Sequence, residues 1–334
     1  MYDPRATKHS WRSAAPLGRG PRNWLAAAAL DTRVFAIGGF GQTGARKGEN
    51  VPAALLTVEA FDMAAPIESA AWTEAPSLRT PRQNLAAATL RGRVYAAGGF
   101  NARRPSGLHV VEVFDGKRWR TGRPMREARS SFALVAVREA NLLVAVGGYG
   151  RGGAILNTAE AYSPPTGPVE VPVEEDDAKD GGGNATNTNS TSNRTEKKKQ
   201  EKSSNEKKQK DGRSGWRALP KMVVPRGGCA GAALNGKVYV SGGCTRRHKL
   251  FSRCERVTYS VEVFDPARRA WMAAPAMSTA RRGHTAAAIF VGNMPRRIYV
   301  VGGCSGATCV HGGNLPNVTN QVTALSSGEA LLMV

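Results

Sequence analysis

The sequence predicts an all-β fold in which copies of a four-stranded antiparallel sheet are arranged radially, as the blades of a propeller. The first observation is an internal repeat. Five Gly-Gly pairs each close a short apolar run rich in strand-forming residues, and successive pairs lie 60, 49, 95 and 60 residues apart. The pairs are Gly38-Gly39, Gly98-Gly99, Gly147-Gly148, Gly242-Gly243 and Gly302-Gly303.

The second observation is the order of the segments between these pairs. A strand with alternating apolar and acidic residues follows four of them, at residues 58–62, 111–115, 159–162 and 261–265. A further run, which would form the fourth strand of each unit, opens on a tryptophan, at Trp72, Trp119, Trp216 and Trp271. One four-stranded sheet cannot cover both of its apolar faces, and stacking copies around an axis solves this while leaving few free edges.

The two ends of the chain predict how the ring closes. Tyr2-Asp3-Pro4 followed by Trp11 repeats the pattern of Phe264-Asp265-Pro266 followed by Trp271. The N-terminal strands are therefore expected to complete the last blade, whose own third strand has only a weak candidate at residues 321–325. Five blades follow if the ring closes in this way, and a six-bladed ring of which this chain is a piece is the alternative.

A change of composition interrupts the repeats. Low-complexity acidic, Asn/Thr/Ser-rich and Lys-rich tracts run from 164 to 213 without apolar periodicity, which predicts a disordered insert. The expected organisation is therefore repeats over 1–163, the insert over 164–213, repeats again over 214–326 and a tail over 327–334.

The charge does not reside in this insert. The chain has 47 Lys and Arg against 26 Asp and Glu, a formal net charge of +21, whereas residues 170–213 hold equal numbers of both signs. The basic excess therefore belongs to the repeats. Arginine pairs such as those at 103–104, 246–247, 268–269 and 296–297 fall in expected turns, where we interpret them as solvated surface. Nucleic-acid binding is not expected, because such turns alternate between the two ends of the blades and aromatic stacking residues are scarce.

The recurring Gly-Gly pair, the aromatic residue three positions before it, the following Glu strand and the Trp resemble the Kelch repeat. The resemblance covers residues 2–303 apart from the insert, with Val144 replacing the aromatic residue in the third copy. It implies a Kelch-type β-propeller and a role in protein–protein interaction, as in the Kelch domains of BTB-Kelch substrate adaptors, here without the BTB part. The glycines and Trp11, Trp72, Trp119, Trp216 and Trp271 are then structural: the glycines for backbone freedom, the tryptophans for packing.

One arginine recurs at a fixed place before each Gly-Gly pair, where the chain enters the innermost strand. These arginines are Arg22, Arg82, Arg129, Arg226 and Arg281. Rotational repetition would place them in a ring on one face, and guanidinium groups suit carboxylates and phosphates. The resemblance to Kelch adaptors implies that they bind an acidic or phosphorylated segment of a partner. The alternative is that they pair with backbone carbonyls or with the repeated Glu inside the protein.

Catalysis finds little support in the sequence, and no metal or cofactor is expected. The five histidines show no metal-ligand spacing. Five cysteines, an odd and sparse number, argue for a reducing compartment and mainly for buried thiols, with zinc or a Cys244–Cys304 redox pair as alternatives; the other three are Cys229, Cys254 and Cys309.

The sequence thus predicts a non-catalytic, monomeric Kelch propeller that binds a protein partner, as part of a ubiquitin ligase in one interpretation. Actin binding, a sugar-handling propeller enzyme and a nucleic-acid binder are the alternatives. The chain has no apolar run long enough to cross a membrane, so we expect a cytoplasmic protein, with the Lys-rich tract as a potential nuclear signal.

Overall fold

The computed structural model describes residues 13–42, 52–66, 69–165, 215–247, 254–289 and 297–305, together with the backbone of 328–332. In these segments every regular element is a β-strand except one 3-10 turn, η1 (Arg151–Gly153). The predicted roles of Tyr2-Asp3-Pro4 and Trp11, and nearly all of the predicted insert, lie outside the described residues.

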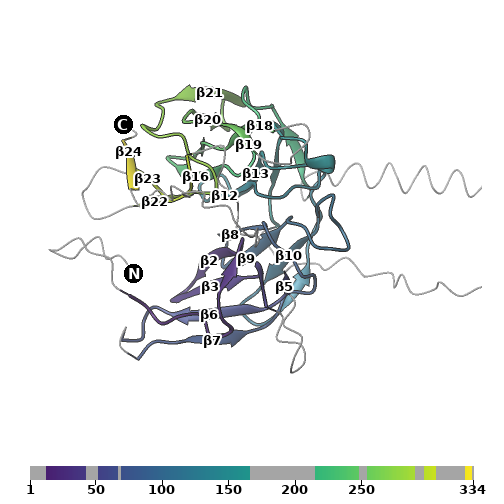
Figure 1. The fold of residues 1–334 in the computed structure, drawn as a ribbon. Coiled ribbons are helices and arrows are strands. Elements are labelled where there is room, and N and C mark those ends of the chain that lie inside the picture. The colour runs from purple at the N-terminus through teal and green to yellow at the C-terminus, as the bar shows by residue number, and fades with distance from the viewer. Residues whose placement is uncertain are drawn as a thin grey trace, which may run out of the picture.

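Four antiparallel sheets have the predicted four strands, and the chain forms each of them in order from the innermost strand outwards (Figure 1). Blade 1 consists of β2 (Ala26–Leu30), β3 (Arg33–Ile37), β6 (Val58–Asp62) and β7 (Trp72–Ala75), and blade 2 consists of β8 (Ala86–Leu90), β9 (Arg93–Ala97), β10 (Val111–Phe114) and β11 (Trp119–Thr121). Blade 3 consists of β12 (Ala133–Val137), β13 (Leu142–Val146), β14 (Ala159–Tyr162) and β15 (Arg217–Leu219). Blade 4 consists of β16 (Ala230–Leu234), β17 (Lys237–Ser241), β20 (Val261–Asp265) and β21 (Ala270–Ala274). The all-β prediction and the four-stranded blade are confirmed.

The fifth sheet corrects the prediction for the C-terminus. Blade 5 consists of β22 (Thr285–Ile289), β23 (Arg297–Val301) and β24 (Gly328–Leu332), and β24 lies in the stretch assigned to a tail. Its register is that of the other third strands: Glu329 lies opposite Val300, as Glu262 lies opposite Val240 in blade 4. The sequence Gly-Glu-Ala-Leu-Leu carries the alternating pattern, so the signal was present. The weaker candidate at 321–325 lies outside the described residues.

Two smaller sheets decorate this frame on the loops after the Gly-Gly pairs. One joins β1 (Arg22–Asn23), β4 (Phe40–Gln42) and β5 (Pro52–Ala54) at blade 1. The other is a two-stranded hairpin of β18 (Cys244–Arg247) and β19 (Cys254–Val257), inserted between β17 and β20 of blade 4.

The innermost strands pack side by side in the order β2, β8, β12, β16 and β22, and apolar clusters fill the spaces between neighbouring blades. Between β22 and β2, at the two ends of this series, the described residues show no comparable packing. Ala27 and Ala29 of β2 and Thr285 and Ala287 of β22 are accordingly exposed. The described blades thus form an arc with an opening between blade 1 and blade 5 (Figure 1).

The repeated tryptophans join each blade to the one before it. The indole Nε1 of Trp119 donates to the Pro76 carbonyl at 2.8 Å, and Trp216 and Trp271 donate to the carbonyls of Arg123 and Pro220. Each of these carbonyls lies four residues after the tryptophan of the preceding blade. Trp72 donates in the same way to Ala15 at 3.0 Å, four residues after Trp11. Ala15 therefore occupies the position that a blade preceding blade 1 would supply.

The Gly-Gly pairs are required by both backbone angle and space. Gly98 has φ +62°, and a Cβ there would lie 2.4 Å from the Arg129 carbonyl and 2.7 Å from the Phe132 ring. Gly99 donates its backbone N–H to that same carbonyl, at 2.9 Å. In blades 1 to 4 the second strand can therefore approach the next blade only through a residue without a side chain, whereas a Cβ at Gly302 of blade 5 would meet no atom within 4 Å.

We expect Gly98→Ala to destabilise the protein by about 2 kcal/mol more than Gly92→Ala. Both glycines have similar positive φ angles, +62° and +65°, but nothing lies within 4 Å of a Cβ at Gly92. Alanine therefore costs similar backbone strain at both positions. The difference between the two losses of stability measures the collision between the added Cβ at position 98 and blade 3. Urea unfolding of the two variants measures it, and equal losses would contradict the close-approach explanation.

The described part of the chain contains no helix with the length and hydropathy needed to span a membrane.

Candidate functional site

The five repeated arginines are inside the protein. Arg82, Arg129, Arg226 and Arg281 have at most 1% of their surface exposed, and Arg22 has 8%. Each donates from Nη1 to the carbonyl of the first glycine of its own Gly-Gly pair, at 2.8–3.3 Å; the acceptors are Gly38, Gly98, Gly147, Gly242 and Gly302.

The second guanidinium nitrogen of four of these arginines binds the repeated glutamate of the same blade. Arg82 Nη2 lies 2.6 Å from Glu112 Oε1, and the side chains of both residues are at most 1% exposed. Glu112 in turn accepts the backbone N–H groups of Arg79 and Thr80 from the segment that leads into blade 2. The equivalent ion pairs are Arg22–Glu59, Arg129–Glu160 and Arg226–Glu262.

These guanidinium groups are charged despite their burial. Burial lowers the pKa of Arg82, and the adjacent Glu112 carboxylate opposes that effect. With their donors directed at carbonyls and carboxylates within the blade, these side chains present no cationic ring to a partner. The expected partner-binding role of the five arginines is therefore not supported by this geometry, whereas the structural alternative describes it.

The residues immediately after these arginines surround the axis instead. The position two residues after each arginine has a positive φ and belongs to Trp24, Asn84, Ser131, Gly228 and Gly283. Their backbones bind one another from blade to blade: Asn84 N–H donates to Trp24 O, Ser131 to Asn84, Gly228 to Ser131 and Gly283 to Gly228, at 2.7–2.9 Å. The blade entrances thus form a belt of hydrogen bonds around the mouth of a central channel.

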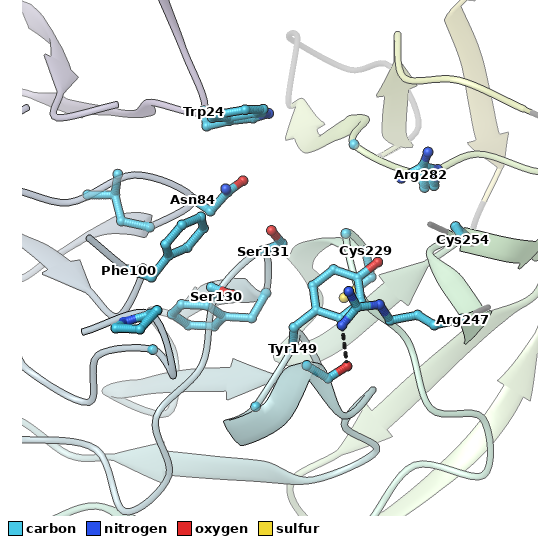
Figure 2. A pocket seen from close by; sticks show the side chains of 18 of the residues that line it. Trp24, Asn84, Phe100, Ser130, Ser131, Tyr149, Cys229, Arg247, Cys254 and Arg282 are labelled. Atoms are coloured by element: carbon cyan, nitrogen blue, oxygen red, sulfur yellow. Dashed lines mark hydrogen bonds between the residues drawn. The ribbon is translucent and has the colours of Figure 1, made fainter. Parts of the chain in front are cut away.

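This mouth opens into a cavity of about 920 Å³, lined by residues of all five blades. Figure 2 shows aromatic, amide and hydroxyl groups around it, from Trp24, Asn84, Phe100, Ser130, Ser131 and Tyr149. Arg247, Arg282 and His284 also line it, and the described residues of its lining include neither an aspartate nor a glutamate. The cavity therefore combines apolar and hydrogen-bonding surface with two arginine side chains.

Tyr149 lies between the two cations of this cavity. The Arg247 guanidinium stacks over its ring, 5.2 Å from the centroid, and donates to the Gly153 carbonyl at 2.7 Å. Burial raises the pKa of Tyr149, and the positive charges of Arg282 and Arg247 oppose that rise. The phenol is thus neutral at physiological pH and within the electrostatic reach of both guanidinium groups (Figure 2). Such a pair suits a carboxylate or another anionic group.

The cysteines differ from the prediction. Cys244 and Cys254 form a disulfide across the β18–β19 hairpin, Cys304 is also disulfide-bonded, and Cys229 is the free thiol in the described residues. The buried-thiol prediction is therefore wrong for Cys244, Cys254 and Cys304, and so is the alternative of a Cys244–Cys304 pair, because Cys244 bonds within its own hairpin. Cys229 fits the buried-thiol interpretation, and burial raises its pKa. Cys309 lies outside the described residues.

His284 of the cavity wall and Ser241 behind it most resemble a catalytic pair. Ser241 Oγ lies 2.9 Å from His284 Nε2, and both residues are buried. His284 Nδ1 has no hydrogen-bond partner, so the pair lacks the carboxylate that orients histidine in hydrolase triads. In the segments that the structure describes, His, Cys, Asp and Glu form no group of three that could hold a metal.

We expect the stability of the protein to fall as the pH drops from 6.5 to 4, by up to about 3 kcal/mol through His284 alone. Burial, together with the charges of Arg281 and Arg226, lowers the pKa of His284 to about 4. The unfolded chain therefore binds a proton in this range that the folded protein does not. Urea unfolding across the range measures the effect. A His284→Gln variant should lose this part of the slope, and an unchanged slope would contradict it.

Sequence reasoning missed most of the cavity. In the sequence, Arg247 is interpreted only as part of a charged turn, and no role is predicted for Arg282 or Tyr149. A signal was available for some positions, since Tyr149 directly follows a Gly-Gly pair and Arg282 directly follows a repeated arginine. The described tryptophans and Gly-Gly pairs lie where neighbouring blades or strands meet, as a structural role would require, and Trp11 lies outside the described residues.

Comparison with known proteins agrees with this geometry. The profile of the Kelch motif matches residues 81–126 and 225–278, which span blades 2 and 4. These two segments of the chain therefore carry Kelch motifs. One relative is described as an F-box/kelch-repeat protein of Arabidopsis thaliana, 38% identical over 56 residues; this is 17% of our chain and 13% of that protein. The chain thus matches about an eighth of that relative's length.

Among solved structures, the fold resembles the one titled "Structure of YjhT", with a TM-score of 0.66. The match covers 98% of this chain and 86% of that one, at 11% sequence identity, and therefore concerns the fold alone. Kelch repeats, four-stranded blades and this likeness together identify a Kelch-type β-propeller, an architecture that serves as a protein-interaction module.

Proposed function

We propose that this Kelch propeller binds an acidic segment of a protein partner at the mouth of its central channel. The observation that carries the proposal is the cavity of about 920 Å³, whose described lining includes Arg247 and Arg282 but neither an aspartate nor a glutamate. Unlike the repeated arginines, these two occur once each and face the cavity. Trp24, Phe100 and Tyr149 add the aromatic surface that protein interfaces favour.

The channel mouth also offers hydrogen-bonding groups that a peptide could use. The side chains of Asn84, Ser130 and Ser131 and the backbone of Gly150–Gly153 surround the two cations. An extended segment with one or two acidic side chains fits this mixture better than a purely apolar ligand does. A phosphorylated side chain presents the same kind of anion, so the proposal includes it as a variant of the same recognition.

A binding titration tests the proposal. We expect a fluorescein-labelled decaglutamate peptide to bind wild-type protein at low salt, and Arg247→Ala to weaken binding about tenfold. The matched control is Arg138→Ala, which removes an exposed arginine at the other end of β12 and should change the affinity by less than about twofold. Equal losses in both variants would indicate non-specific attraction to a basic protein and contradict the proposed site.

The kind of partner and the cellular compartment are further parts of the proposal. The resemblance to Kelch adaptors supports substrate recognition for a ubiquitin ligase, and binding of actin is the second candidate. The Cys244–Cys254 disulfide favours an oxidising environment over the cytoplasm or nucleus expected from the sequence, because cytosolic disulfides are rare.

A further inference from the structure

The β18–β19 hairpin carries one of the two cations of the channel mouth. Arg247 is the last residue of β18, and its partner in the antiparallel register is Cys254 of β19. Cys254 bonds covalently to Cys244 at the other end of β18, ten residues away in sequence. The disulfide therefore encloses the strand segment that presents Arg247.

The hairpin is held loosely by its own hydrogen bonds. It has only two strands, and its register shifts between Cys244 and Arg246 and again between Arg246 and Arg247. Isolated two-stranded hairpins are marginally stable, and a cross-link limits the conformations that such a segment can adopt. The covalent bond thus acts together with the two backbone hydrogen bonds between Cys244 and Gly227 to fix the hairpin that carries Arg247.

Specific contacts with blade 3 hold the Arg247 side chain in place within the cavity. It reaches across to blade 3, where it donates to Gly153 O and stacks on Tyr149. A Cβ at Gly153 would lie 1.8 Å from Arg247 Nη1, so the guanidinium fills the space that this glycine leaves. A small displacement of β18 would break both contacts.

We propose that the Cys244–Cys254 disulfide is a redox control of the anion site at the channel mouth, because it fixes Arg247 against Gly153 and Tyr149. This inference rests on the proposed function of the site. Cys244 and Cys254 are at most 2% exposed, so the bond is shielded, and the side from which a small reductant would approach it is the cavity, which Cys254 lines. Reduction by a dithiol breaks the S–S bond, transfers two electrons and two protons to form the Cys244 and Cys254 thiols, and leaves the dithiol as its cyclic disulfide.

Two measurements on the whole chain test this inference. The first is the affinity for the labelled decaglutamate peptide of oxidised wild-type protein, dithiothreitol-treated protein and the Cys244→Ser/Cys254→Ser variant. We expect dithiothreitol treatment and the double substitution each to weaken peptide binding about tenfold, as Arg247→Ala does. Cys304 is also disulfide-bonded, so dithiothreitol added to the double variant is the control, and it should cause no further loss.

The second measurement needs no ligand. Hydrogen exchange at residues 150–156, which contain the carbonyl that Arg247 binds, should accelerate in the double variant and remain unchanged at residues 93–97 of blade 2. Binding lost with Arg247→Ala but retained in the double variant would overturn the redox control and leave the proposed function intact. If the peptide does not bind at all, the proposed function fails, and unchanged exchange at 150–156 would overturn the positioning role as well.

Discussion

Replacement of Glu112 by alanine is expected to destabilise the protein by about 3–5 kcal/mol, because it leaves a buried guanidinium without its counter-ion. Glu112 is 1% exposed and accepts three hydrogen bonds, from Arg82 Nη2 and from the backbone N–H groups of Arg79 and Thr80. The loss therefore affects both the ion pair within blade 2 and the segment that enters it. Urea unfolding followed by tryptophan fluorescence measures it.

A double-mutant cycle with Arg82→Ala makes this test specific. The free energy of unfolding of the double variant should fall by markedly less than the sum of the losses in the two single variants, because no unpaired charge remains buried. The matched control is the exposed pair Arg19–Glu74, whose side chains are 47% and 70% exposed. Glu74→Ala should cost less than about 1 kcal/mol. Additive losses at Arg82 and Glu112 would show that the pair is not coupled.

Replacement of Trp119 by alanine is expected to cost about 3–5 kcal/mol. The indole is 6% exposed, packs against Phe114 with ring centroids 5.1 Å apart, and donates to the Pro76 carbonyl of blade 1. Alanine removes the apolar contact and leaves a cavity between two blades. Urea unfolding again measures the change.

Trp271 provides the comparison for this prediction. It makes the equivalent bond to Pro220 and packs on Phe264 at 5.2 Å, but its side chain is only partly buried. Trp271→Ala should therefore cost about half as much as Trp119→Ala, in proportion to the apolar area withdrawn from water. A loss below about 1 kcal/mol in Trp119→Ala would contradict the packing role of the repeated tryptophan.

The sequence predicted the blade because each of its strands has a local pattern. The alternation at Val111–Phe114 and the glycines after β9 are direct requirements of antiparallel pairing and close approach, so they recur in each copy. Glu329 has the same backbone register, yet its strand was missed, because a long segment separates it from β23 and interrupts the spacing on which the prediction relied.

The site was harder to predict because it depends on differences between the copies. The arginines that repeat are needed by every blade and are buried, whereas Arg247 belongs to the β18–β19 hairpin that is inserted into blade 4. Its partner Gly153 lies 94 residues earlier in the chain, beyond the insert. Sequence periodicity identifies the residues that all blades share, and these build the scaffold. It does not identify the residues that occur once and distinguish one face of the propeller.

The most direct test of the central claim is to cross-link a bound acidic peptide from two ends of the propeller. A photoreactive benzoylphenylalanine at Asn84 lies at the channel mouth, and one at Arg138 lies at the opposite end of the innermost strands. We expect the labelled decaglutamate peptide to cross-link from position 84, with competition by unlabelled peptide, and not from position 138. Cross-linking from position 138 alone would place the partner on the other end of the blades and contradict the proposed site.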